Sequence, residues 1–170
     1  DLLNKEGKVL INRASTIEPL NDSLFLIQAN GKASIYNVNS SQYSLTNNFT
    51  DFVTPEYNYG YGPINIGVKN SKDQWGILNK QGELLIEPQY CDVMSSSDGY
   101  VIVAQCGAVG AAFKYGVIDL MNNIVIPFEY DSIESVYGES YECVKGTTLY
   151  TINLSNEVIS KRPVSEESEN

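Results

Sequence analysis

The chain has 170 residues, 42% of them hydrophobic, and its 11 basic and 21 acidic side chains give a net charge of −10. A chain of this length can bury a core, but such an acidic surface repels nucleic-acid phosphates and anionic lipids. We therefore expect no nucleic-acid partner. We see no apolar run long enough to span a bilayer and no signal peptide, so no membrane insertion is expected within this segment.

One segment recurs along the chain. Residues 75–86 read as a strand, a glycine-containing turn and a second strand, which is the pattern of a β-hairpin. They overlay residues 115–126 without a gap, and the match continues through Tyr90 onto Tyr130. Internal similarity of this length predicts an array of one small structural unit.

In chain order, the first unit begins just after its aromatic position, and the second is degenerate because its hairpin match fades across residues 40–48. A small-residue insert, residues 107–112, separates the third unit from the fourth. The tail, residues 161–170, is acidic and lacks an apolar pattern, so we expect disorder there. Because the chain starts inside a unit and lacks an initiator Met, we interpret it as a fragment of a larger protein. The predicted units, of which the first and last are incomplete, lie near residues 1–32, 33–74, 75–114, 115–148 and 149–160.

Each unit contains a hairpin followed by a third short strand, such as residues 100–104, and none has a helical period. Alternating apolar and polar residues with many β-branched side chains favour half-buried antiparallel strands. One unit cannot bury its apolar face alone, so neighbouring units must pack on one another. We predict an all-β array, residues 1–160, of repeats of about 33–42 residues. The unequal spacing favours an open curved stack, and propeller-like closure is the alternative.

Asn or Asp occupies an equivalent turn position in all five copies. These side chains accept hydrogen bonds from the backbone two residues on, which starts a turn. Gly7 and Gly82 follow three residues later and supply a positive φ, for which Asn122 and Asn156 are the substitutes. We interpret this ladder as turn chemistry. The residues are Asn4, Asn37, Asn79, Asp119 and Asn153.

The aromatic–Gly start, the hairpin and a following Pro-x-Tyr pattern resemble the WG-repeat family. The resemblance implies a mostly bacterial tandem-repeat protein that has no shared catalytic residues and serves as a scaffold for binding partners. Only one of the five copies carries the Trp, and the copy that starts at Leu149 lacks the Gly. The repeat-motif residues with a structural role are Trp75, Gly76, Gly82, Tyr90, Tyr115, Gly116 and Tyr130.

The chain lacks the residues that most catalytic and metal-binding sites require. The chain has no His, which excludes Ser/His/Asp and Cys/His nucleophiles and most zinc sites. It has neither a P-loop nor a dinucleotide-binding glycine motif. Cys91, Cys106 and Cys143 lack CxxC spacing, so we expect three partly buried thiols, of which at most one pair could form a disulfide. We predict no cofactor and no enzymatic activity.

Two sets of side chains could still form a site. Paired carboxylates could support acid–base chemistry, and loop carboxylates could bind calcium, but we interpret the acids as turn or surface residues. Alternate tyrosines on an extended segment could form a platform for a sugar or a peptide, although packing between repeats is the favoured interpretation. The acids are Asp92, Asp98, Asp119, Glu129 and Asp131, and the tyrosines are Tyr57, Tyr59 and Tyr61.

Three functional hypotheses follow. The leading one is a non-enzymatic repeat scaffold that binds a protein partner, because an array presents a large surface without a reactive cluster. The second is a surface or secreted carbohydrate-binding module that uses Tyr57, Tyr59 and Tyr61. The third is an accessory domain of an enzyme whose catalytic part lies outside this chain. The expected location is the bacterial cell envelope or the outside of the cell.

Overall fold

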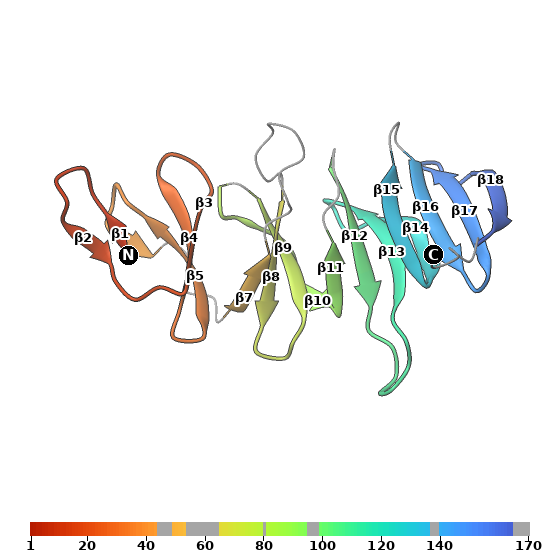
Figure 1. The fold of residues 1–170 in the computed structure, drawn as a ribbon, viewed down its shortest axis with the longest axis horizontal. Coiled ribbons are helices and arrows are strands. Elements are labelled where there is room, and N and C mark those ends of the chain that lie inside the picture. The colour runs from red at the N-terminus through yellow and green to blue at the C-terminus, as the bar shows by residue number, and fades with distance from the viewer. Residues whose placement is uncertain (44–48, 54–64, 80, 95–98, 137–139, 165–170) are drawn as a thin grey trace, which may run out of the picture. The chain divides into compact units, whose positions relative to one another are not determined.

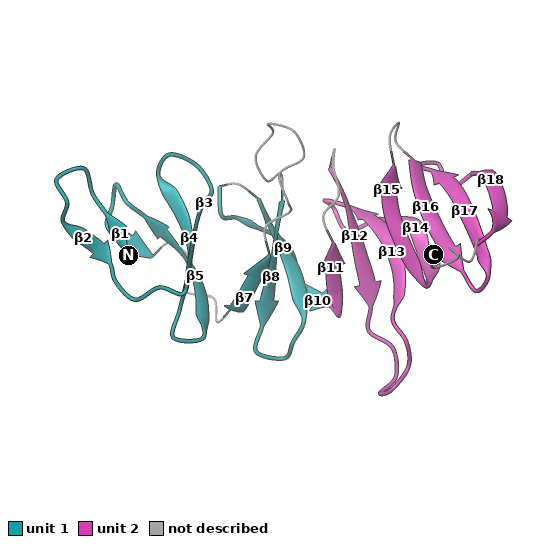
Figure 2. Cartoon of the chain, viewed as in Figure 1, with its two compact units in different colours: residues 1–89 teal, residues 90–170 magenta. Residues whose placement is uncertain are grey.

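The structure is a computed structural model, and it describes residues 1–43, 49–53, 65–79, 81–94, 99–136 and 140–164. Across these ranges the chain forms eighteen β-strands and no helix (Figure 1), which confirms the predicted all-β class. Contacts divide the chain into two compact units, residues 1–89 and residues 90–170 (Figure 2), and each is described by itself. The described part of the chain therefore holds no helix that could cross a membrane.

The first ten strands are antiparallel and form a two-stranded and an eight-stranded sheet. Among the described residues of the larger sheet, β5 and β7 are joined by a single residue pair, Ala33 with Phe49. The larger sheet therefore consists of two four-stranded parts, β3–β6 and β7–β10. The bounds are β1 Leu2–Leu3, β2 Val9–Ile11, β3 Thr16–Pro19, β4 Leu24–Ala29, β5 Lys32–Asn37, β6 Gln42–Tyr43, β7 Phe49–Val53, β8 Asn65–Asn70, β9 Trp75–Asn79 and β10 Leu84–Tyr90.

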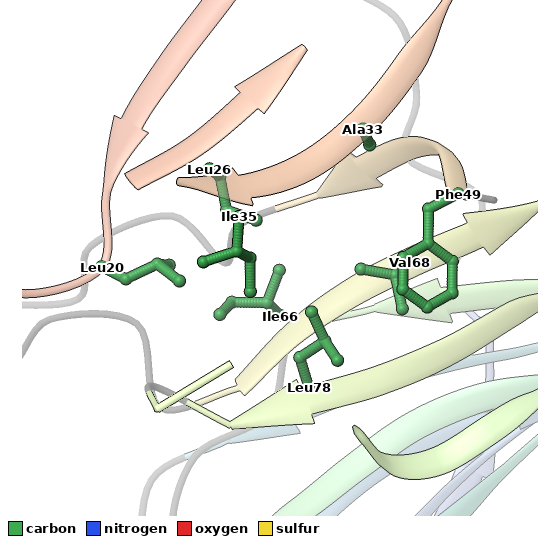
Figure 3. Packing of buried hydrophobic residues seen from close by; sticks show 8 residues of the cluster. All are labelled: Leu20, Leu26, Ala33, Ile35, Phe49, Ile66, Val68 and Leu78. Carbon is green, nitrogen blue, oxygen red and sulfur yellow. The ribbon is translucent and has the colours of Figure 1, made fainter. Parts of the chain in front are cut away.

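The core of unit 1 lies between these two four-stranded parts. Figure 3 shows side chains from β4 and β5 facing those from β7, β8 and β9. Burial of such aliphatic and aromatic groups is the main favourable term in folding. The cluster is Leu20, Leu26, Ala33, Ile35, Phe49, Ile66, Val68 and Leu78.

The central strands of unit 1 are buried on both faces, not on one face as the alternation pattern predicted. Leu26 of β4 belongs to the cluster in Figure 3, whereas its neighbour Ile27 packs with Ile11 of β2 and Tyr36 of β5 in a second cluster. Successive residues of a strand point to opposite faces. The hairpin β1–β2 therefore covers one face of β3–β6, and β7–β10 cover the other.

Unit 2 consists of two four-stranded antiparallel sheets, β11–β14 and β15–β18. Their facing side chains form one core in which Ile102, Val117 and Ile126 of the first sheet meet Ile133 and Ile152 of the second. The bounds are β11 Asp92–Met94, β12 Tyr100–Gln105, β13 Lys114–Asp119, β14 Ile124–Tyr130, β15 Ser132–Val136, β16 Ser140–Lys145, β17 Thr148–Asn153 and β18 Val158–Pro163.

The repeat in the sequence and the sheet in the structure are out of phase. The predicted unit 115–148 supplies β13 and β14 as the last two strands of one sheet and β15 and β16 as the first two of the next. Each predicted hairpin after the first is therefore the third and fourth strand of a four-stranded group, and the predicted third strand is the second strand of the following group; the first hairpin, β1–β2, forms its own two-stranded sheet. The prediction missed the first strand of both sheets of unit 2, because β11 has only three residues and β15 buries only Ile133.

The prediction of disorder from residue 161 onward is wrong for residues 161–163, which belong to β18. β18 continues to Pro163, and Lys161 and Arg162 pair with Tyr150 and Leu149 of β17. Every side chain of β18 is exposed, so the strand is formed by backbone pairing and leaves no apolar pattern in the sequence. Residues 165–170 lie outside the described part of the chain.

An open stack and propeller-like closure differ in how successive four-stranded sheets are arranged along the whole chain. Both alternatives stay predictions.

Candidate functional site

The predicted turn ladder is confirmed as turn chemistry. The side-chain oxygen of each of its five residues accepts two backbone N–H hydrogen bonds from the next few residues, at 2.8–3.3 Å. Gly7 and Gly82 have φ of 79°, and Asn122 and Asn156 take the same left-handed region at 67° and 59°. Asn70 makes the same turn with Asp73 at φ 59°, and the prediction missed it.

The glycine of the aromatic–Gly motif is required by close backbone approach rather than by its φ. A Cβ on Gly76 would lie 2.4 Å from the carbonyl oxygen of Ile86, and one on Gly116 would lie 2.7 Å from that of Ile126. In unit 2 the pairing of β13 with β14 shifts register at this point, since Tyr115 pairs with Tyr130 but Val117 with Ile126. The bulged strand therefore folds over the glycine.

The motif tyrosines of unit 2 are engaged within the fold. Tyr90 is 8% exposed, stacks on Phe128, and donates a 2.6 Å hydrogen bond to the Asn122 side-chain oxygen. Tyr130 is buried and contacts the edge of the Tyr150 ring. Burial, followed by the charge of Glu129, raises the pKa of Tyr130 to about 12. These side chains hold the hairpins in place.

Tyr115 and Trp75, the aromatic residues that open their units, are half-buried. The Tyr115 hydroxyl donates a 2.8 Å hydrogen bond to Asp92, and burial together with that bond raises the pKa of Tyr115 to about 12. In unit 1 the Lys69 ammonium lies 5.3 Å from the Trp75 ring centre, a cation–π distance. Each ring thus has a polar partner from its own sheet.

The candidate carboxylates make structural bonds. Asp92 accepts from Tyr115, and Glu129 pairs with Lys145 at 2.5 Å. Hydrogen bonds from the side chain and backbone of Asn123 lower the pKa of Asp119. Asp98 lies outside the described residues. Within the described ranges, no group of three or more Cys, Asp or Glu side chains could hold a metal ion.

The tyrosines proposed as a ligand platform, Tyr57, Tyr59 and Tyr61, also lie outside the described residues, so their role as platform or core stays a prediction.

The expectation of three thiols is wrong for two of the cysteines. Cys91 and Cys106 form a disulfide, the single pair that the cysteine count allowed. They flank the paired strands β11 and β12, and the Cys91 N–H donates a 2.9 Å hydrogen bond to Ala104. Their spacing in the sequence does not show this neighbourhood, which strand pairing creates. Cys143 is a buried free thiol whose pKa burial raises to about 12.

The connection between β12 and β13 is the exposed feature that the structure adds. Residues 106–113, here called the apolar tip, are exposed throughout and carry no charged side chain. They extend beyond the strand ends of their own sheet (Figure 1). The Ala111 N–H donates a 2.9 Å hydrogen bond to Ala108, which closes a turn with Gly110 at φ 83°. Val109, between them, is fully exposed.

Both ends of the apolar tip are anchored. At one end, the disulfide ties Cys106 to Cys91 beside β11. At the other, Lys114 pairs with Asp131 at 2.5 Å, and the second oxygen of Asp131 accepts a 2.7 Å hydrogen bond from the Gly146 N–H. The Lys114 hydrogen bond, then that from Gly146, lower the pKa of Asp131. A surface ion pair contributes at most about 1 kcal/mol, so the disulfide is the stronger anchor.

Comparison with solved structures concerns the fold alone, at 10–12% identity. One match is the crystal structure of the eukaryotic initiation factor, whose sequence is 12% identical to this chain. Its TM-score is 0.55, and the match covers 89% of this chain and 41% of that one. Kluyvelomyces marxianus Hsv2 is 10% identical with a TM-score of 0.53, and the match covers 90% and 50%. Both contain β-propellers, whose blades are four-stranded sheets. The chain spans half or less of the length of these two proteins.

No curated protein matches the sequence. The family described as "WG containing repeat" matches residues 75–105 and 115–141. These segments carry the two close-approach glycines, Gly76 and Gly116, and the motif tyrosines Tyr90 and Tyr130. The resemblance seen in the sequence is therefore confirmed, and the chain carries WG-containing repeats at residues 75–105 and 115–141.

Proposed function

We propose that the chain is a non-enzymatic repeat scaffold that binds a protein partner. One observation supports this most. The described acidic and aromatic side chains that could form a reactive site are bonded within the sheets, as Asp92 is to Tyr115 and Glu129 is to Lys145. The stacked sheets of each unit meanwhile present broad surfaces, which is how repeat proteins bind their partners.

The disulfide supports an oxidising location for this scaffold. Cys91 and Cys106 are bonded, and structural disulfides persist outside the cytosol, in the envelope or in secreted proteins. A partner would then be another envelope or extracellular protein. The net charge of −10 favours a basic partner surface through long-range attraction.

The proposal is tested by affinity capture from extracts of the source cell and its envelope. A variant with Tyr57, Tyr59 and Tyr61 all changed to Ala is run in parallel, and its fold is checked by circular dichroism. We expect both proteins to retain the same partner protein, which is then purified and titrated by calorimetry. Retention of glycan by the wild type alone would contradict the proposal and favour a carbohydrate-binding module.

Turnover by the purified complex would instead favour the third hypothesis, an accessory domain of an enzyme. Within the described residues no observation favours either alternative over the scaffold.

A further inference from the structure

The apolar tip is an insertion relative to the other sheets. The same connection, from the second to the third strand, has two residues in β4–β5 and in β16–β17 and four in β8–β9, but eight in β12–β13. The two family matches stop at residue 105 and resume at residue 115, so the apolar tip lies outside the repeat pattern. The other sheets make the same connection with two to four residues, so the fold does not require an eight-residue segment here.

The composition of the apolar tip is unusual for an exposed loop. Connecting loops are normally polar, because their side chains and peptide groups face water. The apolar tip instead consists of glycine, alanine, valine and phenylalanine after Cys106, with Val109 at its turn and Phe113 45% exposed near its base. A contiguous exposed apolar segment of this kind is a candidate interaction site.

The apolar tip is also held in one place before any partner arrives. The disulfide fixes one end, the Lys114–Asp131 pair fixes the other, and the Ala108–Ala111 hydrogen bond closes the turn. A Cβ on Gly107 would lie 3.3 Å from that of Ala111, so the two sides of the loop approach closely. Such preorganisation reduces the conformational entropy lost on binding.

The chemistry of the apolar tip favours a protein over a bilayer. The peptide groups of a turn need hydrogen-bond partners, which a protein pocket can provide and hydrocarbon cannot. The tip has no Trp, Tyr or Arg to anchor it at a lipid interface, and Lys114 is already paired with Asp131. The net charge of −10 disfavours anionic lipid and favours a basic protein surface.

We infer that the apolar tip, through Val109, enters a narrow apolar pocket in a protein partner whose surface around that pocket is basic. This inference rests on the proposed function, because it identifies the contact by which the scaffold binds. Small residues on both sides of Val109 make the tip slender, so the matching pocket needs to admit only one branched side chain.

Met121 provides a matched control. It is 80% exposed in the turn between β13 and β14, and so it is an apolar side chain on the next hairpin connection of the same sheet. A photo-crosslinking amino acid, p-benzoylphenylalanine, is placed at position 121 or at position 113 of the full chain, where it replaces the exposed aromatic Phe113 and leaves Val109 in place. After irradiation in envelope extract, crosslinked proteins are identified, purified and titrated by calorimetry against wild type, Val109→Asp and Met121→Asp.

We expect one protein to crosslink at position 113 and not at position 121. Val109→Asp should weaken its binding at least about tenfold, because burial of the valine is lost and a charge enters the pocket. Met121→Asp should bind as the wild type does, and both variants should keep the wild-type circular dichroism, since each position is exposed.

Equal affinity of Val109→Asp and wild type for a confirmed partner would overturn the inference and leave the proposed function standing. If no protein crosslinks or binds at all, both fail. Co-sedimentation of the wild type, but not of Val109→Asp, with neutral phosphatidylcholine vesicles would replace the protein pocket by a bilayer.

Discussion

The glycine of the aromatic–Gly motif is required because the backbone of the paired strand leaves no room for a side chain. At Gly76 and Gly116 the space of a Cβ is filled by a carbonyl oxygen of the paired strand, and neither glycine has a positive φ. The sequence reveals the recurrence of this glycine but not its reason, because the reason is the close approach of a paired strand's backbone, which at Gly116 accompanies a register shift. The turn residues could be predicted, since Asn79 and Gly82 act within one local segment.

Gly116→Ala should destabilise unit 2 by about 1–3 kcal/mol, because the added methyl overlaps backbone that cannot move aside without breaking strand pairing. The free energy of unfolding, measured with urea, provides the test. Gly107→Ala is the control, since Gly107 also lacks a positive φ but lies in the exposed apolar tip. Equal stability of the two variants would show that the close approach at Gly116 is not rigid.

Asp119→Asn should remove part of the acid sensitivity of the fold. Hydrogen bonds from Asn123 lower the pKa of Asp119 below its ordinary value of 3.8. The stability contributed by ionised Asp119 is therefore fully present above about pH 4 and lost as the pH falls through the lowered pKa. Asn79 and Asn153 make the same turn without a charge.

The test compares urea unfolding of wild type and Asp119→Asn at neutral and acidic pH. The variant should match the wild type at neutral pH and lose less stability on acidification. An identical loss in both proteins would mean that Asp119 does not contribute to the acid transition.

At the scale of elements, the hairpins were predictable and the first strand of each sheet of unit 2 was not. The third strands have paired apolar neighbours, such as Val117 and Ile118, both buried, and each third-to-fourth strand turn opens with Asn or Asp. β11 and β15 have no comparable pattern, because they are short edge strands; each begins two residues after the tyrosine, Tyr90 or Tyr130, that ends the preceding strand. The disulfide was missed for a related reason, since strand pairing brings Cys91 and Cys106 together.

Changing both Cys91 and Cys106 to Ser should lower the free energy of unfolding by about 3 kcal/mol, the value expected for a crosslink that closes a loop of about 15 residues. A thiol reagent should label no cysteine in the native protein, because Cys143 is buried and its pKa is raised to about 12. In denaturant without reductant it should label Cys143 alone. Labelling of Cys91 and Cys106 under that condition would contradict the disulfide.

At the scale of the whole molecule, the repeat predicts the fold class and the insertion suggests the function. Residues 75–105 and 115–141 have the recurring pattern because each hairpin must pack in the same way. The segment between them was recognised in the sequence only as small residues. The binding role that we infer for it depends on its exposure, on its two anchors and on the shorter connections in the other sheets. A single sequence shows none of these.

The measurement that tests this account most directly replaces the apolar tip with the chain's own Asn30–Gly31 turn. That turn joins Ala29 and Lys32, which pair as Gln105 and Lys114 do, so it fits the strand ends of β12 and β13. Because Cys106 is lost, Cys91 is changed to Ser, and the Cys91→Ser/Cys106→Ser protein is the control. Urea unfolding and binding of the crosslinked partner are measured for both.

We predict that the turn replacement folds as stably as its control and no longer binds the partner. Loss of the fold would show that the apolar tip is part of the repeat structure. Undiminished binding would show that the partner contacts another surface of the scaffold.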